Sequence, residues 1–210
     1  MKMFLRCGTC FILFWIVLLL AGPVSAAVFE VTNAGDSGEE SFRQAISDAA
    51  GTPEADTIVF TPGLENATLF LQTELPKPPG DLTIDGTYAP LIDGSSISGS
   101  MHGPTDYTGL YIQNQSNITI TGLRITGLRY GVVIWYGASN ITIEGCTLTS
   151  IHDVGEHAYC ILFHPSGEVS QNLTFINNTI EKAGIAVHSL ETSSTVQGLT
   201  ISGNICTDAS

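Results

Sequence analysis

Four copies of one short motif decide the fold. They read Asn117-Ile-Thr-Ile120, Asn140-Ile-Thr-Ile143, Asn172-Leu-Thr-Phe175 and Gly198-Leu-Thr-Ile201. Aligned on Thr119, Thr142, Thr174 and Thr200, the copies are 23, 32 and 26 residues apart. Repeats of about 20 to 50 residues are typical of solenoids and propellers. A weaker earlier copy is Leu82-Thr-Ile84.

Apolar and polar residues alternate within every copy, which predicts strands rather than helices. A second alternating run follows in each repeat: Leu110-Tyr-Ile112, Val132-Val-Ile134, Ile161-Leu-Phe163 and Ile185-Ala-Val187. Three short strands in a coil of this length predict a parallel β-helix, in which aligned residues stack about 4.8 Å apart. A propeller blade would need about 40 residues, and the two-residue turns of sandwich hairpins are missing.

The alignment also predicts which side chains meet inside the coils. Two buried stacks are expected, one of Ile120, Ile143, Phe175 and Ile201, and one of Ile134, Phe163 and Val187. Asn178 and Asn204 share the inward position of Cys146 and suit an internal ladder.

Sequons for N-glycosylation occur at six sites, but three of their asparagines fall at one repeat position. A turn asparagine that bonds neighbouring backbone explains that regularity better than glycosylation. The sequons are at Asn66, Asn114, Asn117, Asn140, Asn172 and Asn177.

The segment before the coils has a different character. Residues 1–26 read as an export signal, with Lys2 and Arg6 ahead of an apolar run and small residues up to Ala26. The apolar run is short for a membrane span of about 20 residues, which favours a cleaved signal. A retained anchor is the alternative if the run is counted from Cys7. Residues 27–80 hold the first strands and a helix that begins with the capping-box pattern Ser41-Phe-Arg-Gln44. Such a helix could cover the open end of a solenoid.

Several stretches of this region resemble a known group of proteins. They are Val31-Thr-Asn-Ala-Gly-Asp-Ser-Gly38, Ser41-Phe-Arg-Gln-Ala-Ile46, Ala55-Asp-Thr-Ile-Val-Phe60 and Leu82-Thr-Ile-Asp-Gly86. Together with the repeats at 81–210, the sequence resembles exported right-handed parallel β-helix proteins of the pectate-lyase-like superfamily. The resemblance implies an all-β, right-handed parallel β-helix with a short N-terminal capping helix, secreted or held at the cell surface. It does not supply an activity, because the superfamily includes lyases, hydrolases, epimerases and adhesins.

Charge excludes one class of partner. The 210 residues carry 7 Lys and Arg against 20 Asp and Glu, a formal charge of −13. The few basic residues are outnumbered by acids and cannot neutralise a run of phosphates, so no nucleic-acid partner is expected. No stable membrane span is expected once the signal is removed.

Two groups of residues are candidate binding sites. Alignment of the later strands places Gln113, Trp135, His164 and His188 in one row, with Tyr136 beside it. This row could stack on sugar rings or serve only as a packing ladder at a bend. The longest repeat also contains His152, Asp153, Glu156 and His157, which could bind a divalent cation. The alternative is a solvated polar loop, because no zinc or EF-hand spacing is matched.

Catalytic patterns are weak. Asp85 and Asp93 each occur as Ile-Asp-Gly, which predicts turns in which Asp caps and Gly supplies a positive φ. The basic residues within the clear repeats are Arg124, Arg129 and Lys182. The first hypothesis is therefore a surface or extracellular binding or structural module, with a polysaccharide or surface glycan as partner. A polysaccharide lyase or glycoside hydrolase on the same scaffold is the alternative, and an extracytoplasmic metal-binding protein is the second.

Two further expectations concern the cysteines and the end of the chain. Cys146 and Cys206 are two coils apart, about 9.6 Å, beyond the usual Cα reach of about 7 Å for a disulfide. With Cys160 on another strand, the processed chain is predicted to have three thiols that are free or paired between molecules, with no disulfide within the chain. The last repeat stops at Ser210 before its later strand. We expect a truncated solenoid whose open end contacts the rest of a longer chain or another copy.

Overall fold

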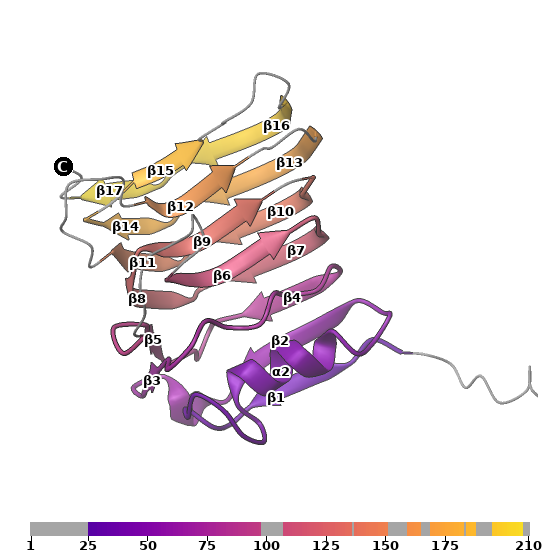
Figure 1. Cartoon of the computed structure of the whole chain (residues 1–210), viewed down its shortest axis with the longest axis vertical. Coiled ribbons are helices and arrows are strands. Elements are labelled where there is room, and N and C mark those ends of the chain that lie inside the picture. Colours follow the sequence, from indigo (N-terminus) through magenta and orange to yellow (C-terminus); the bar gives the residue numbers. More distant parts are fainter. Residues whose placement is uncertain are drawn as a thin grey trace, which may run out of the picture.

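The computed structural model describes residues 25–97, 107–135, 137–150, 159–164, 169–182, 184–187 and 195–207. Within these ranges, the chain winds through three parallel sheets that form the sides of a solenoid (Figure 1). The longest sheet has seven strands. They are β1 (Val28–Val31), β2 (Asp56–Phe60), β4 (Leu82–Asp85), β7 (Ser116–Thr121), β10 (Ser139–Glu144), β13 (Val169–Ile176) and β16 (Thr195–Ser202).

Two shorter sheets complete the coils. The six-stranded sheet contains β3 (Thr68–Phe70), β5 (Leu91–Asp93), β8 (Arg124–Leu128), β11 (Thr147–Ser150), β14 (Thr179–Glu181) and β17 (Ile205–Thr207). The four-stranded sheet contains β6 (Thr108–Gln113), β9 (Tyr130–Trp135), β12 (Tyr159–His164) and β15 (Gly184–Val187). Each full coil therefore contributes one strand to every sheet, and the architecture is a parallel β-helix, as the repeats predicted.

Register follows the motif threonines. Thr119 lies opposite Thr142, Thr142 opposite Thr174, and Thr174 opposite Thr200 on neighbouring parallel strands. The same row continues back through Thr83 to Thr57. Thr57 was not recognised as a repeat position from the sequence, because Asp56 stands where the motif has an apolar residue, opposite Leu82.

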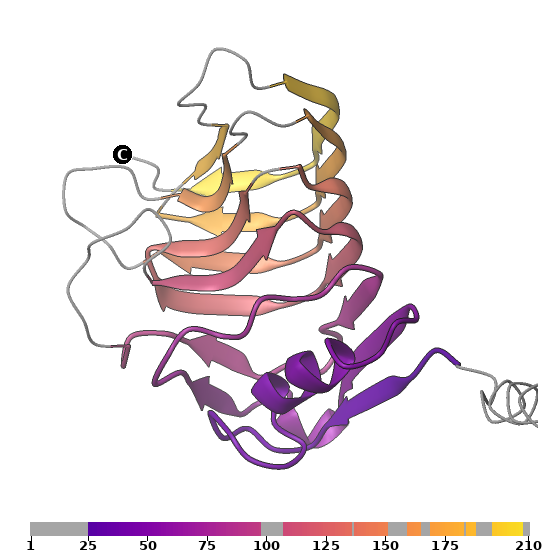
Figure 2. The same ribbon diagram turned by 45° about the vertical axis from the view of Figure 1, so that its right-hand side comes forward.

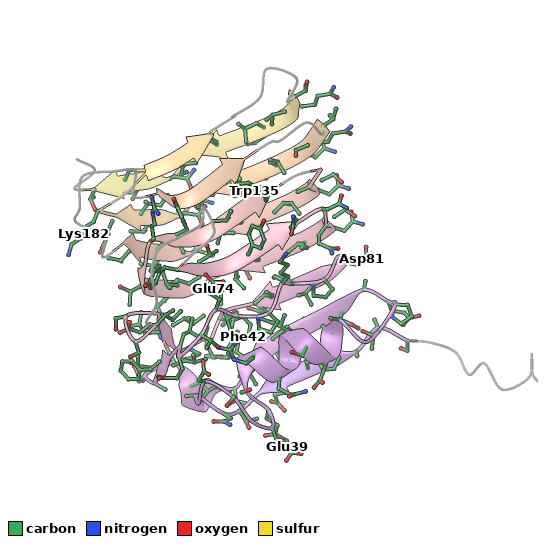
Figure 3. All side chains as sticks on the ribbon, in the orientation of Figure 1. Glu39, Phe42, Glu74, Asp81, Trp135 and Lys182 are labelled. Atoms are coloured by element: carbon green, nitrogen blue, oxygen red, sulfur yellow. The ribbon has the colours of Figure 1, made fainter. Side chains whose placement is uncertain are left out.

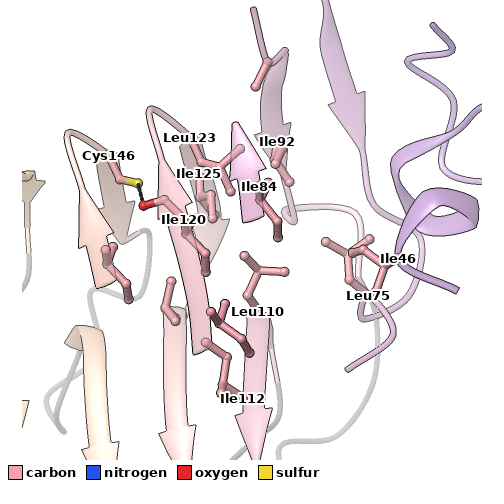
Figure 4. Packing of buried hydrophobic residues seen from close by; sticks show 14 of the residues in the cluster. Ile46, Leu75, Ile84, Ile92, Leu110, Ile112, Ile120, Leu123, Ile125 and Cys146 are labelled. Carbon is pink, nitrogen blue, oxygen red and sulfur yellow. Dashed lines mark hydrogen bonds between the residues drawn. The ribbon is translucent and has the colours of Figure 1, made fainter. Parts of the chain in front are cut away.

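The inward-facing side chains form one continuous core (Figure 4). Ile120, Ile143 and Phe175 are fully buried and in register, which confirms most of the first predicted stack. Ile201 was wrongly expected to be buried: 48% of it is exposed. The reason is its position on β16, the last strand in the order of its sheet, which no other described strand covers.

The second predicted stack is confirmed at the level of the backbone. Ile134 pairs with Phe163, and Phe163 with Val187, on β9, β12 and β15. Ile134 is fully buried in the core.

A short helix, α2 (Phe42–Ala49), lies at the N-terminal end of the stack against β1 and β2 (Figure 2). Its buried face joins the solenoid core, and the ring of Phe42 lies 5.1 Å from that of Phe60. The Ser41 hydroxyl accepts a hydrogen bond from the Gln44 N–H at 3.2 Å, as the capping pattern predicted. The Gln44 side chain instead donates to Asp48, so the box is only half formed. A 3-10 helix, η1 (Pro62–Leu64), follows β2.

Gly86 permits two coils to approach closely. It has no positive φ, contrary to the sequence expectation for the Ile-Asp-Gly turns. A Cβ atom here would instead lie 2.5 Å from the carbonyl oxygen of Thr121 and 2.7 Å from the backbone nitrogen of Leu123. Glycine is therefore required by contact with the next coil, not by its own conformation.

We expect Gly86→Ala to lower the free energy of unfolding by about 2 kcal/mol, because the clash involves backbone atoms that cannot rotate away. Gly63→Ala is the matched control, since a Cβ atom there would meet nothing within 4 Å. Urea unfolding of both variants checks the prediction. Equal stability of the two would show that the coils can separate at no cost.

Candidate functional site

The row predicted on the four-stranded sheet is present in the backbone register. Gln113 lies opposite Trp135, and Trp135 opposite His164, at the ends of β6, β9 and β12. Tyr136 and His188 lie outside the described residues. The sequence alignment therefore placed three members of the row correctly.

The outer face of this sheet carries an aromatic cluster. Tyr130, Val133 and Trp135 point away from the main core yet are 4%, 0% and 7% exposed. Tyr111 on β6 packs against them, with its ring 6.4 Å from that of Trp135 and inclined at 60°. Trp135 is labelled in Figure 3. Trp135 is thus packed on its neighbours and does not offer an open ring face. The sequence analysis missed both tyrosines as part of this cluster: Tyr111 occupies the outward position of the predicted run Leu110-Tyr-Ile112, whereas Tyr130 lies two residues before the predicted run that begins at Val132.

Polar groups border this cluster. Lys77 comes from the proline-rich segment before β4, and its Nζ lies 4.7 Å from the centre of the Tyr111 ring. The same ammonium donates a hydrogen bond to Oε1 of Gln113 at 2.5 Å. A cation over an aromatic ring is held by the negative face of the ring. Lys77, Tyr111 and Gln113 therefore form one fixed group at the accessible edge of the aromatic cluster.

The predicted cation loop cannot be placed. His152, Asp153, Glu156 and His157 lie outside the described residues. Within the described ranges, no three His, Cys, Asp or Glu side chains come together in a way that could hold a metal ion.

The candidate acids and bases have structural partners. Asp85 accepts hydrogen bonds from the backbone and hydroxyl of Thr87, and Asp93 accepts one from the Ser95 N–H at 2.8 Å. Both are turn aspartates, as expected. Arg124 donates to the carbonyl oxygens of Glu65 and Ala89, so its guanidinium ties two loops together.

A ladder of side-chain amides runs along one corner of the longest sheet. Asn172 donates to Asn140 at 2.9 Å, Asn140 to Asn117 at 2.8 Å, and Asn117 to the carboxylate of Asp81 at 2.7 Å. All four residues have positive φ, between 53° and 59°. Turn asparagines were expected, but their side chains bond each other and not the backbone. Asparagine suits both demands, because it tolerates the left-handed region and carries a donor and an acceptor.

The two cysteines with described side chains are unpaired, as predicted. Cys146 is buried and Cys206 is exposed. Desolvation by burial raises the pKa of the Cys146 thiol from 9.0 to about 11. Cys160 lies on β12, and its side chain is outside the description.

We expect a thiol reagent to modify Cys206 in the folded protein at pH 8 and to leave Cys146 intact, because the thiolate is the reactive form. The folded state holds the Cys146 proton more tightly, so this residue's contribution to stability is complete below pH 9 and is lost as the pH rises toward 11. Peptide mass mapping after native and denaturing labelling checks this. Rapid native labelling of Cys146 would contradict it.

The fold and its polar ladders define the class of the protein, a parallel β-helix with side chains stacked in rows. A profile of the right-handed β-helix region matches residues 81–210, and the chain belongs to this family. The handedness predicted from the resemblance is thereby supported. A search of curated proteins finds no match. Among the described residues, no helix has the length and apolar character needed to cross a membrane.

Proposed function

We propose that the protein is an exported β-helix domain that acts as a cell-surface or extracellular binding module for glycans. The observation that carries the proposal is the group formed by Lys77, Tyr111 and Gln113 beside Trp135. Aromatic rings take up the apolar faces of sugars, while fixed amide and ammonium groups hydrogen-bond their hydroxyls. The predicted export signal at residues 1–26 would bring this face into contact with extracellular polymers.

Binding is favoured over catalysis by what the charged groups do. Arg124 is occupied by backbone carbonyls, and Asp85 and Asp93 are occupied by their turns. A hydrolase would need two carboxylates facing one another across a bond to be cleaved. Among the described residues, the polar groups at the edge of the aromatic cluster are the Lys77 ammonium and the Gln113 amide. A pair of carboxylates is not among these neighbours.

The test is a glycan array probed with residues 27–210, followed by titration of the strongest ligand. Tyr111→Ala should weaken binding about tenfold or more, because a central aromatic contact is lost. Tyr88→Ala is the matched control, since Tyr88 is 40% exposed and lies outside the cluster. Equal loss in both variants, or no glycan bound by the parent chain, would overturn the proposal.

A further inference from the structure

Asp56, at the start of β2, is a buried carboxylate with no lysine or arginine partner among the residues that the structure describes. Only 3% of it is exposed. One oxygen accepts a hydrogen bond from the Ala27 N–H at 2.8 Å, and the other accepts one from the Thr52 hydroxyl. The ion pair found within the described residues joins Arg43 to Asp36 and does not involve Asp56. Burying an ionised carboxylate without a counter-charge raises the free energy of the folded state, so a cation placed beside Asp56 would stabilise the protein.

A second carboxylate in the same segment is also incompletely paired. Oε2 of Glu54 is buried and has no hydrogen-bond partner within the described part of the chain. The stretch from Glu54 to Asp56 therefore carries two acids and, among the described residues, no ion pair with lysine or arginine.

The sequence independently predicts a signal-cleavage site immediately before Ala27, the residue whose N–H binds Asp56. The predicted signal ends with Val24-Ser25-Ala26, small residues of the kind that precede a cleavage site. Ser25 and Ala26 are exposed and outside regular structure. Among the described residues, Ala27 is the first with hydrogen bonds to a neighbouring strand: its N–H donates to Asp56 and its carbonyl accepts the Thr57 N–H at 2.9 Å. Cleavage after Ala26 would therefore leave the sheet intact.

We propose that this cleavage creates the missing cation, and that the α-ammonium group of Ala27 forms a buried ion pair with Asp56. The inference rests on the proposed export. Hydrolysis of the Ala26–Ala27 peptide bond consumes one water, leaves a carboxylate on Ala26 and frees the amine of Ala27. That amine binds a proton at neutral pH, since an ordinary α-amino pKa is about 7.7 to 8.0. The nitrogen that donates as an amide in the precursor then carries a positive charge at the same place.

The consequence is that removal of the signal stabilises the fold. In the precursor, the described donors to Asp56 are the neutral Ala27 N–H and Thr52 hydroxyl, whereas in the processed chain Asp56 has a charged partner. Trimming beyond Ala27 would move the α-ammonium group to a later residue and remove the hydrogen bond that the Ala27 nitrogen makes to Asp56. The position of the cleavage, and not only its occurrence, therefore matters for stability.

The test compares three chains that differ only at the N-terminus: residues 27–210 with a free amine, the same chain acetylated at Ala27, and residues 25–210. The acetylated chain keeps the N–H donor but loses the charge. We expect the free-amine chain to have the highest Tm and an unfolding equilibrium constant about tenfold smaller than the other two. In Asp56→Asn chains this difference should vanish, whereas in Asp48→Asn chains, which alter an exposed acid, it should persist.

Equal stability of the free and acetylated chains would overturn the inference, even if Asp56→Asn failed to fold. The mass of the exported protein tests the export separately. A mature chain that begins at Ala27 but gains no stability would leave the export standing and reject the ion pair. A mature chain that begins elsewhere would reject the cleavage point itself.

Discussion

Replacing Phe175 by alanine should lower the free energy of unfolding by about 3 to 5 kcal/mol. Phe175 is fully buried on β13, in register with Ile143 on one side and Ile201 on the other. Truncation removes the transfer free energy of the ring and leaves a cavity between coils whose spacing is fixed by backbone hydrogen bonds. Urea unfolding followed by circular dichroism measures the change.

Thr174→Ala is the matched control for this prediction. Thr174 is the preceding residue on the same strand and faces outward, so its truncation creates no cavity in the core. We expect its effect to stay within about 0.5 kcal/mol, as is usual at surface positions. If Phe175→Ala unfolded at the same urea concentration as Thr174→Ala, the inward register of β13 would be wrong.

Asn178→Ala should destabilise the protein by about 3 kcal/mol. The Asn178 side chain is 1% exposed and serves three partners inside the coil. Its amide nitrogen donates to the carbonyl of Ile143 at 3.0 Å and to Oδ1 of Asn204 at 2.9 Å, while its oxygen accepts the Cys146 N–H at 2.9 Å. Removing it leaves two backbone groups buried without partners, at about 1 to 3 kcal/mol each.

The hydrogen-bond origin of this effect can be separated from the loss of volume. Asn178→Leu restores the volume but not the donors and acceptor, so it should remain destabilising. Asn66→Ala, which truncates an exposed asparagine, should change the midpoint of urea unfolding little. Stability equal to the parent in Asn178→Leu would mean that water or backbone shifts satisfy the freed groups.

The register of the coils could be predicted from the sequence because threonine recurs at one position of every copy. Strand alternation then assigned inward and outward residues, and this succeeded for Ile120, Ile143 and Phe175. It failed to anticipate β9, where all six residues are buried because the outer face of the strand carries its own aromatic cluster. Alternation describes a strand with one solvated face and cannot report a second layer of packing.

Other features could not be predicted, since they depend on residues that are distant in the sequence. The need for glycine at position 86 arises from the backbone of residues 121–123, one coil later. The contact between Lys77 and Tyr111 joins an irregular segment to a strand 34 positions away. Asp56 was read only as part of a resemblance, and its bond to Ala27 emerges when β1 and β2 pair.

The amide ladder from Asp81 to Asn172 has a consequence for how such a protein can change during evolution. Its rungs are separated by 36, 23 and 32 residues in the chain, yet each bonds the next with the same geometry. Insertions of different length are therefore accommodated elsewhere in the coil while this corner keeps its alignment. The ladder keeps successive coils in register, so that a loop can lengthen or shorten without shifting the inward-facing residues out of alignment. Foreign peptides grafted between Ser150, where β11 ends, and Tyr159, where β12 begins, should be tolerated for the same reason.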